Sequence, residues 1–156
     1  MIINLKHIRP FRKHKSLEVT LSKLGDKIKF ADLLEKADIL DAIWCLRETE
    51  TDDAQYELAI KIMMYVRHYS DSKAAINTAI DYYYDIANIK ELHQASDDAY
   101  KAWKVNKTPI NWASFCLTKI DDCDPTDLLY DVTEAAINNN QNMEERIKTM
   151  LLEVFA

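Results

Sequence analysis

Glycine is almost missing from this chain: Gly25 is the only one in 156 residues, and there are three prolines. Sheets and dinucleotide-binding folds need glycine for turns, bulges and phosphate loops, so this composition disfavours both. The three cysteines stand at unrelated positions and do not form a disulfide framework. They favour a reducing, cytoplasmic setting. No uninterrupted apolar run reaches the ~18 residues of a membrane span, so no contact with a membrane is predicted.

Helical periodicity and helix start signals fill most of the sequence instead. Asp38 is a typical N-cap, and Thr108-Pro109 and Asp124-Pro125 each place a capping side chain before a proline at the first helical position. The helix that opens at Thr51 is apolar around most of its circumference, so we expect other helices to surround it. Trp44 is expected in the core. The fold class is therefore all-α, a single compact bundle of about eight helices over residues 16–156.

Charge is unevenly distributed along the chain. The net charge is −6, yet the first 15 residues carry five bases and no acid, and the other 141 carry 15 bases against 26 acids. Residues 1–15 are thus predicted to form a basic N-terminal arm that contributes little to the core. The arm either docks on its own acidic body or contacts an anionic partner through its cations. These candidate partner-binding residues are Lys6, Arg9, Arg12, Lys13 and Lys15.

A second candidate surface lies on the helix that opens at Thr51. Glu57, Lys61 and His68 are spaced so that they share one side of it, and Met64 falls within the same line. These four residues are further partner-binding candidates. We expect the Met64 side chain itself to be buried under a neighbouring segment.

No catalytic, cofactor-binding or metal-ligating residues are predicted. The four histidines lack ligand spacing, and the Asp121–Asp124 loop has no glycine and is interrupted by Pro125, unlike a calcium loop. Cys45 and Cys116 stand in apolar helical runs, and Cys123 lies among aspartates that disfavour its thiolate. Enzyme activity is disfavoured. Nucleic-acid binding is disfavoured as well, except through the N-terminal arm, because the body is acidic.

One motif resembles a known family. The run Asp41-Ala42-Ile43-Trp44-Cys45-Leu46-Arg47 is similar to a motif of small helical proteins from phages and prophages, some of which are described as immunity proteins. Further counterparts are Leu58-Ala59, Val66-Arg67-His68, Ser72 to Ile76, and Glu91-Leu92 to Trp103. The resemblance covers about residues 20–105 and implies a phage-related origin, no enzyme chemistry and no transferable functional residues.

Together these patterns favour a phage or prophage accessory protein in the cytoplasm of a bacterial host. It would bind a host or phage protein and inhibit a defence or nucleic-acid-processing system. Two alternatives stay open: an immunity protein that neutralises a toxin, and a small enzyme with an unrecognised site. Pairing of the chain with a second copy is also left open.

Overall fold

A computed structural model describes residues 1–8 and 15–156, with the backbone alone for residues 15 and 16. The predicted all-α class is confirmed: the described residues form nine α-helices, and their strands pair in one small ribbon. The α-helices are α1 (Lys15–Leu21), α2 (Phe30–Lys36), α3 (Ile39–Trp44), α4 (Asp52–Val66), α5 (Lys73–Tyr83), α6 (Ile89–Val105), α7 (Pro109–Leu117), α8 (Pro125–Asn139) and α9 (Met143–Phe155). None of these helices is both long and apolar enough to cross a membrane.

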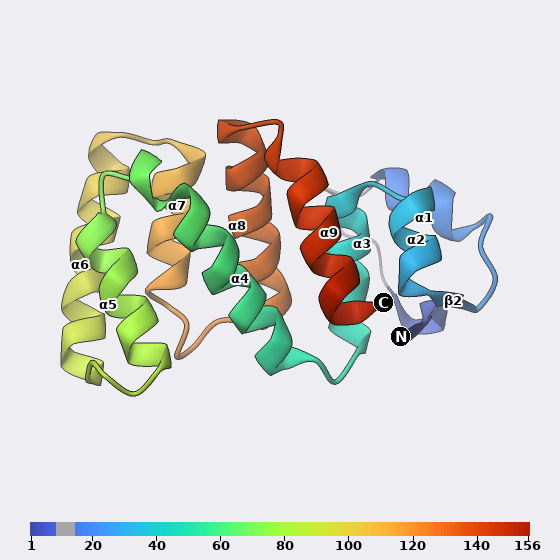
Figure 1. Cartoon of the computed structure of the whole chain (residues 1–156), viewed down its shortest axis with the longest axis horizontal. Helices are drawn as coiled ribbons and strands as arrows, with labels where there is room; N and C mark the ends of the chain where they lie inside the picture. Colours follow the sequence, from blue (N-terminus) through green and yellow to red (C-terminus); the bar gives the residue numbers. More distant parts are fainter. Residues whose placement is uncertain (9–14) are drawn as a thin grey trace.

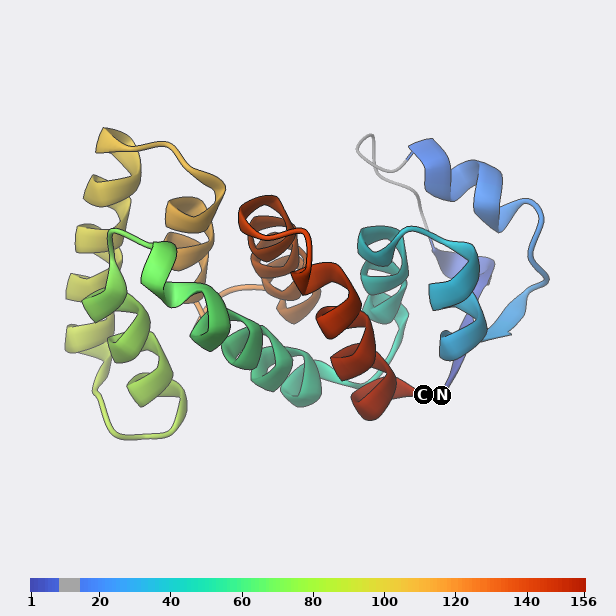
Figure 2. The same cartoon turned by 45° about the horizontal axis from the view of Figure 1, so that its top comes forward.

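The chain runs from one end of the long axis of the molecule to the other and then returns, so that α8 and α9 lie in the middle (Figure 1). The pair α5 and α6 forms one end, and α1, α2 and the β-ribbon form the other (Figures 1 and 2). Three short 3-10 helices connect the larger elements: η1 (Leu5–His7), η2 (Cys45–Glu48) and η3 (Arg67–Tyr69). The two chain ends lie close together beside α9 (Figure 1).

Helix α8 occupies the middle of this arrangement. It contacts α4 and α7 on one side and α3 and α9 on the other (Figure 1). Its buried residues therefore cover most of its circumference: Thr126, Leu128, Leu129, Tyr130, Val132, Thr133, Ala135 and Ala136. The expectation that the helix after Thr51 is the surrounded one is wrong. Its neighbours α7, α8 and α9 leave Lys61, Met64 and Tyr65 exposed, so α8 is the central helix.

The predicted start signals act as capping side chains. Asp38 accepts a hydrogen bond from the Leu40 N–H at 2.9 Å, and Thr108 accepts one from the Asn111 N–H at 3.3 Å. Asp124 accepts from the first turn of α8. Each cap satisfies backbone donors that have no partner within the helix.

The end of α5 differs from the sequence prediction. The periodicity predicts a helix to about Asn88, but α5 ends at Tyr83. Asp85 has φ 60°, in the left-handed region, and the Ile86 N–H donates to the Asp81 carbonyl at 2.7 Å. This is the Schellman arrangement, with aspartate where glycine is usual. A side chain that tolerates the left-handed conformation therefore stops the helix without glycine.

The N-terminal residues correct two expectations. Strand β1 (Ile2–Asn4) pairs antiparallel with β2 (Lys27–Lys29). The apolar spacing of Phe30, Leu33 and Leu34 predicts a short helical segment over residues 27–36, but its first three residues form the strand and the helix begins at Phe30. The expectation that residues 1–15 contribute little to the core is wrong for Ile3 and Leu5, which are buried in it. Strand alternation explains this, because Ile3 points inward while its neighbours point to solvent.

Trp44 is half-buried, not a full core residue as expected. Its ring packs edge-on against Tyr130 of α8, with centroids 6.5 Å apart, and the Arg47 guanidinium lies over it. Because Trp44 is the last residue of α3, the edge of its ring can contact α8 while its face contacts the Arg47 cation. Trp44 thus joins two helices while remaining partly accessible.

Adjacent isoleucines test the role of β1. Ile3→Ala should lower the free energy of unfolding by ~2–5 kcal/mol, because it empties a fully buried site. Ile2→Ala is the matched control, since Ile2 is 66% exposed and should change stability by at most ~0.5 kcal/mol. Urea unfolding followed by circular dichroism measures both. Equal small effects would show that β1 does not belong to the cooperative unit.

Candidate functional site

A closed cluster of four aromatic rings lies where α6 meets α7. Tyr100 and Trp103 stand three residues apart on α6, and Trp112 and Phe115 stand three apart on α7, so each pair shares one helix face. The centroid distances are 5.8 Å for Tyr100–Trp103, 4.9 Å for Trp103–Trp112, 5.6 Å for Trp112–Phe115 and 5.2 Å for Phe115–Tyr100. Each ring therefore contacts two others.

Three lysines lie over these rings. The Lys104 ammonium is 5.5 Å from the Tyr100 centroid, and Lys107 is 5.5 Å from that of Trp103. Lys119 is 5.4 Å from the Phe115 centroid. These distances fall within the range of cation–π attraction. We name these four rings and three lysines the aromatic–lysine face.

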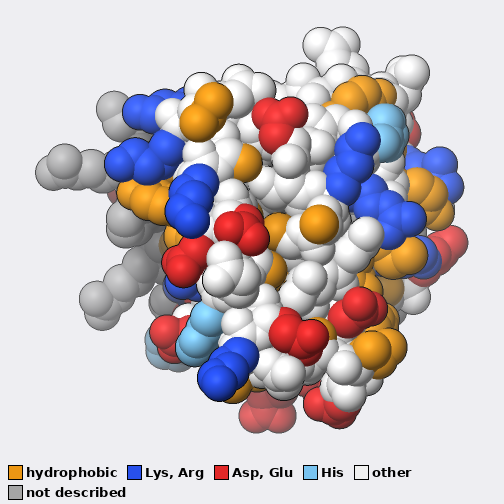
Figure 3. All heavy atoms as spheres, turned by 90° about the vertical axis from the view of Figure 1, so that its left-hand side faces the viewer, with side chains coloured by type: hydrophobic (Ala, Val, Ile, Leu, Met, Phe, Trp, Pro, Cys, Tyr) orange, Lys and Arg blue, Asp and Glu red, His pale blue; other side chains and the backbone are white. Residues whose placement is uncertain are grey.

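The aromatic–lysine face is partly open to solvent. Tyr100 is 40% and Trp112 38% exposed, whereas Trp103 and Phe115 are half-buried. Figure 3 looks onto the α5–α6 end of the molecule and shows Lys and Arg side chains beside hydrophobic ones near its margins. Large aromatic side chains in such a setting combine apolar contact area with nearby charge.

Small residues bring α6 close to its neighbours beneath this face. Ala95 and Ala99 of α6 form a buried cluster with Ala75 of α5, and Phe115 of α7 packs against it. The alanine spacing predicts such a close approach of two helices, and the structure confirms it. Phe115 thus connects the ring cluster to the interior.

A polar network around buried Asn111 fixes the turn between the two helices. The fully buried Asn111 amide donates to Asp71 at 2.8 Å and to the Asn106 carbonyl at 2.9 Å. The Asn106 amide donates to the same Asp71 carboxylate at 2.9 Å. The hydrogen bond from Asn111 lowers the pKa of Asp71 most, and the bond from Asn106 lowers it further, because both favour the charged carboxylate. The start of α7 is held in register with the end of α6.

The aromatic–lysine face also differs in charge from the rest of the chain. Residues 99–120 contain four lysines and no Asp or Glu, the longest acid-free stretch of the sequence. The remaining residues carry 16 Lys and Arg against 26 Asp and Glu. Residues 99–120 are therefore a basic segment of an acidic chain, and the Asp71 carboxylate lies against the Asn106 and Asn111 side chains of this segment.

Sequence reasoning missed this site. Its signal was present in the two aromatic pairs at a spacing of three and in the run without acids. The Tyr82–Tyr84 run is more conspicuous in the sequence, but successive helical residues advance by about 100°, so these three rings cannot share one face. At least one of them is predicted to be peripheral, and Tyr84 is 54% exposed. The contact of Trp103 with Trp112 joins two helices, so helical spacing within one of them does not reveal it.

Three of the candidates predicted on α4 come together. Glu57, Lys61 and Met64 line an open hollow of 280 Å³ with Tyr84 and Val154. The expected burial of Met64 is wrong, since it is 49% exposed. His68 does not line this hollow; it lies in η3 and contacts the Tyr69 ring at a centroid distance of 4.0 Å. The four predicted residues are thus exposed, but only Glu57, Lys61 and Met64 share one surface.

The predicted basic arm is described only in part. Lys6 lies 3.6 Å from Asp26, as expected if the arm docks on its own body. Arg9, Arg12 and Lys13 lie outside the described residues, as does the Lys15 side chain. Beside the β-ribbon, an open hollow of 430 Å³ is lined by Lys23, Lys27, Lys29 and Lys36 together with Asp32.

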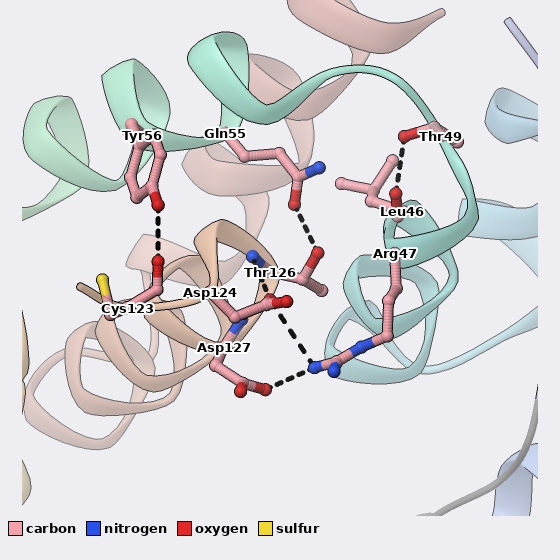
Figure 4. A network of polar contacts seen from close by, with 9 residues as sticks. All are labelled: Leu46, Arg47, Thr49, Gln55, Tyr56, Cys123, Asp124, Thr126 and Asp127. Carbon is pink, nitrogen blue, oxygen red and sulfur yellow. Dashed lines mark hydrogen bonds and ion pairs between the residues drawn. The ribbon is translucent and has the colours of Figure 1, made fainter. Parts of the chain in front are cut away.

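The polar cluster around Arg47 has a structural role. Its guanidinium lies 4.1 Å above the Trp44 ring, donates to Asp127 and stands 3.7 Å from Asp124, the cap of α8 (Figure 4). Buried Gln55 of α4 accepts from the Thr126 hydroxyl at 2.8 Å. These contacts join α3 and α4 to the start of α8, so they account for the cluster without a ligand.

Burial raises the pKa of all three cysteines. Burial, with a smaller contribution from Asp41, raises the pKa of Cys45 to about 12. Burial and then Asp124 raise the pKa of Cys123 to about 12, and burial and Asp131 raise the pKa of Cys116. The thiolate is the nucleophilic form, so these positions do not suit nucleophilic catalysis at neutral pH.

Comparison with known proteins places the chain in no family: no family model matches it, and no curated protein or solved structure is similar to it. Within the described ranges, no group of three or more His, Cys, Asp or Glu side chains could hold a metal ion. The aromatic–lysine face is therefore the strongest candidate site that the geometry offers.

The raised pKa of Cys45 predicts a loss of stability in alkaline solution. Above its ordinary pKa of 9.0 the unfolded chain releases this proton while the folded chain keeps it, so stability falls as pH rises toward about 12. By about pH 10.5 this loss should reach ~2 kcal/mol. Urea unfolding at about pH 8 and about pH 10.5 measures it. Cys45→Ala should show a shallower fall, and an identical fall in both proteins would contradict the assignment.

Proposed function

We propose that this chain is a phage or prophage accessory protein that acts in a bacterial cytoplasm by binding another protein, and that it docks through the aromatic–lysine face. A host defence or nucleic-acid-processing protein is the target we favour. The phage origin rests on the resemblance over about residues 20–105. The docking site rests on the geometry at the α6–α7 end.

The observation that carries this proposal is the partly exposed ring cluster that includes Trp112. Tryptophan and tyrosine are enriched among the residues that dominate binding energy at protein interfaces. Trp112 contacts two other rings and has no lysine over it, so a partner side chain can reach it. Its neighbours already hold its position, which lowers the entropy lost on binding.

The two helices present these rings as a rigid surface. The Asn111 network and the alanine contacts beneath α6 hold the backbone on both sides of the face. The hollow on α4 is a weaker candidate, because Tyr84 is the one aromatic side chain among its described lining residues. Tyr84, at its rim, contacts Tyr83 at a centroid distance of 5.2 Å. The proposal therefore favours α6 and α7 over α4.

A pair of variants tests this proposal. The full-length chain, Trp112→Ala and Tyr84→Ala serve as baits in a lysate of the bacterium that carries the gene. We expect a stoichiometric protein retained by the wild type and by Tyr84→Ala, with at least about tenfold weaker binding to Trp112→Ala, the effect of removing a central interface residue. Tyr84→Ala is matched as an exposed aromatic residue and also probes the α4 hollow.

Circular dichroism of Trp112→Ala controls for misfolding. Retention of the partner by a folded Trp112→Ala protein would contradict docking through the aromatic–lysine face. Loss of the partner only in Tyr84→Ala would move the site to the α4 hollow. A captured toxin encoded beside the gene would identify the chain as an immunity protein that uses the same face.

A further inference from the structure

We infer that the partner of the aromatic–lysine face is a protein segment in which Asp or Glu side chains stand beside apolar ones. This inference rests on the proposed docking function and adds the chemistry of the partner. It follows from the free charge of the lysines, from the inclination of the rings and from the charge of the surrounding protein.

The lysines of the face have no carboxylate partner of their own. In the described part of the chain, Lys104, Lys107 and Lys119 form no ion pair, whereas nearby Lys101 lies 4.0 Å from Asp98. Each of the three ammoniums lies over a ring and still has donors left for an acceptor. A carboxylate can bind to these donors while the cation–π contact stays in place.

The rings do not form a platform for nucleic-acid bases. Base stacking needs open, flat ring faces. Here neighbouring rings are inclined by 33° to 56°, and a lysine lies over Tyr100, Trp103 and Phe115. A base that stacked on one of these three rings from the lysine side would have to displace the cation. Irregular side chains of a protein fit such inclined surfaces better than parallel bases do.

Trp112 supplies the apolar part of the site. It is the one ring of the aromatic–lysine face without a lysine over it, and it is 38% exposed. An apolar partner side chain that packs on Trp112 would remove both surfaces from water. The face therefore selects a segment with carboxylates around an apolar anchor.

The remainder of the protein directs such a segment to this face. Outside residues 99–120 the chain has ten more acids than bases, so an acidic segment is repelled from most of the surface. Opposite charge at the face increases the association rate and makes binding sensitive to salt. The charge of the protein thus favours an acidic partner in two ways: it guides the partner toward the face, and it attracts the partner once contact is made.

Selection from a display library of random 12-residue peptides tests the inference. The bait is the full-length chain, with counter-selection against Trp112→Ala. We expect the enriched peptides to combine at least two Asp or Glu with an aromatic or large aliphatic residue. Fluorescence anisotropy of an enriched peptide should show at least about tenfold weaker binding when its acids are changed to Asn and Gln, or when salt is raised to about 0.5 M.

Two triple variants separate the local contribution of the lysines from net charge. Lys104→Gln, Lys107→Gln and Lys119→Gln together should weaken peptide binding at least about tenfold. Lys27→Gln, Lys29→Gln and Lys36→Gln make the same change in charge at the other end of the molecule and should leave binding within about twofold (Figure 1). Equal weakening by both triples would overturn direct contact with the face lysines.

The remaining outcomes distinguish this inference from the proposed function. Enriched peptides that depend on Trp112 but lack acids overturn the acidic partner and leave protein docking standing. A fluorescent 20-residue thymidine oligonucleotide that binds more tightly than any peptide, and loses binding in Trp112→Ala, replaces the protein partner with single-stranded nucleic acid. Absence of any Trp112-dependent peptide, together with capture of the cellular partner by Trp112→Ala, overturns both.

Discussion

The burial of α8 over most of its circumference is the constraint on which the rest of the structure depends. A helix with leucine, valine and alanine around its circumference is stable in water only when other helices cover it. Here α3, α4, α7 and α9 do so. Polar contacts fix the position of the start of α8, because Asp124 caps the helix and Arg47 joins it to α3. One end of a nonpolar helix is thereby held by polar contacts.

The position of the candidate site follows from that arrangement. Helix α7 packs one side on α8 and cannot bury its full circumference, so Trp112 and Phe115 meet Tyr100 and Trp103 on α6 instead. Lysines cover most of the rings and acids are missing from the surrounding chain. This combination is unusual for a surface that only closes a fold, since aromatic side chains gain most stability when they are buried.

Local signals predicted several of the helix starts because capping depends on a few adjacent residues. Asp38, Thr108 and Asp124 identify three of them, and the alanine spacing on α6 identifies a close helix contact. The same reasoning misplaced the centre of the bundle. The α4 sequence is more apolar around its circumference than a typical surface helix, but Met64 and Tyr65 lie on its open side. Burial is decided by where the neighbours pack, and α4 has them on one side.

By itself the sequence determined the all-α class, the main helix starts, the absence of recognisable metal-ligand spacing and the uneven charge, because each depends on composition or on residues close in the chain. Only the tertiary structure decided that α8 is central, that Ile3 completes the core through strand pairing, and that Trp103 meets Trp112. These outcomes depend on contacts between separate elements. Which of several apolar faces is covered, and which stays exposed, is settled by the packing of all the helices together.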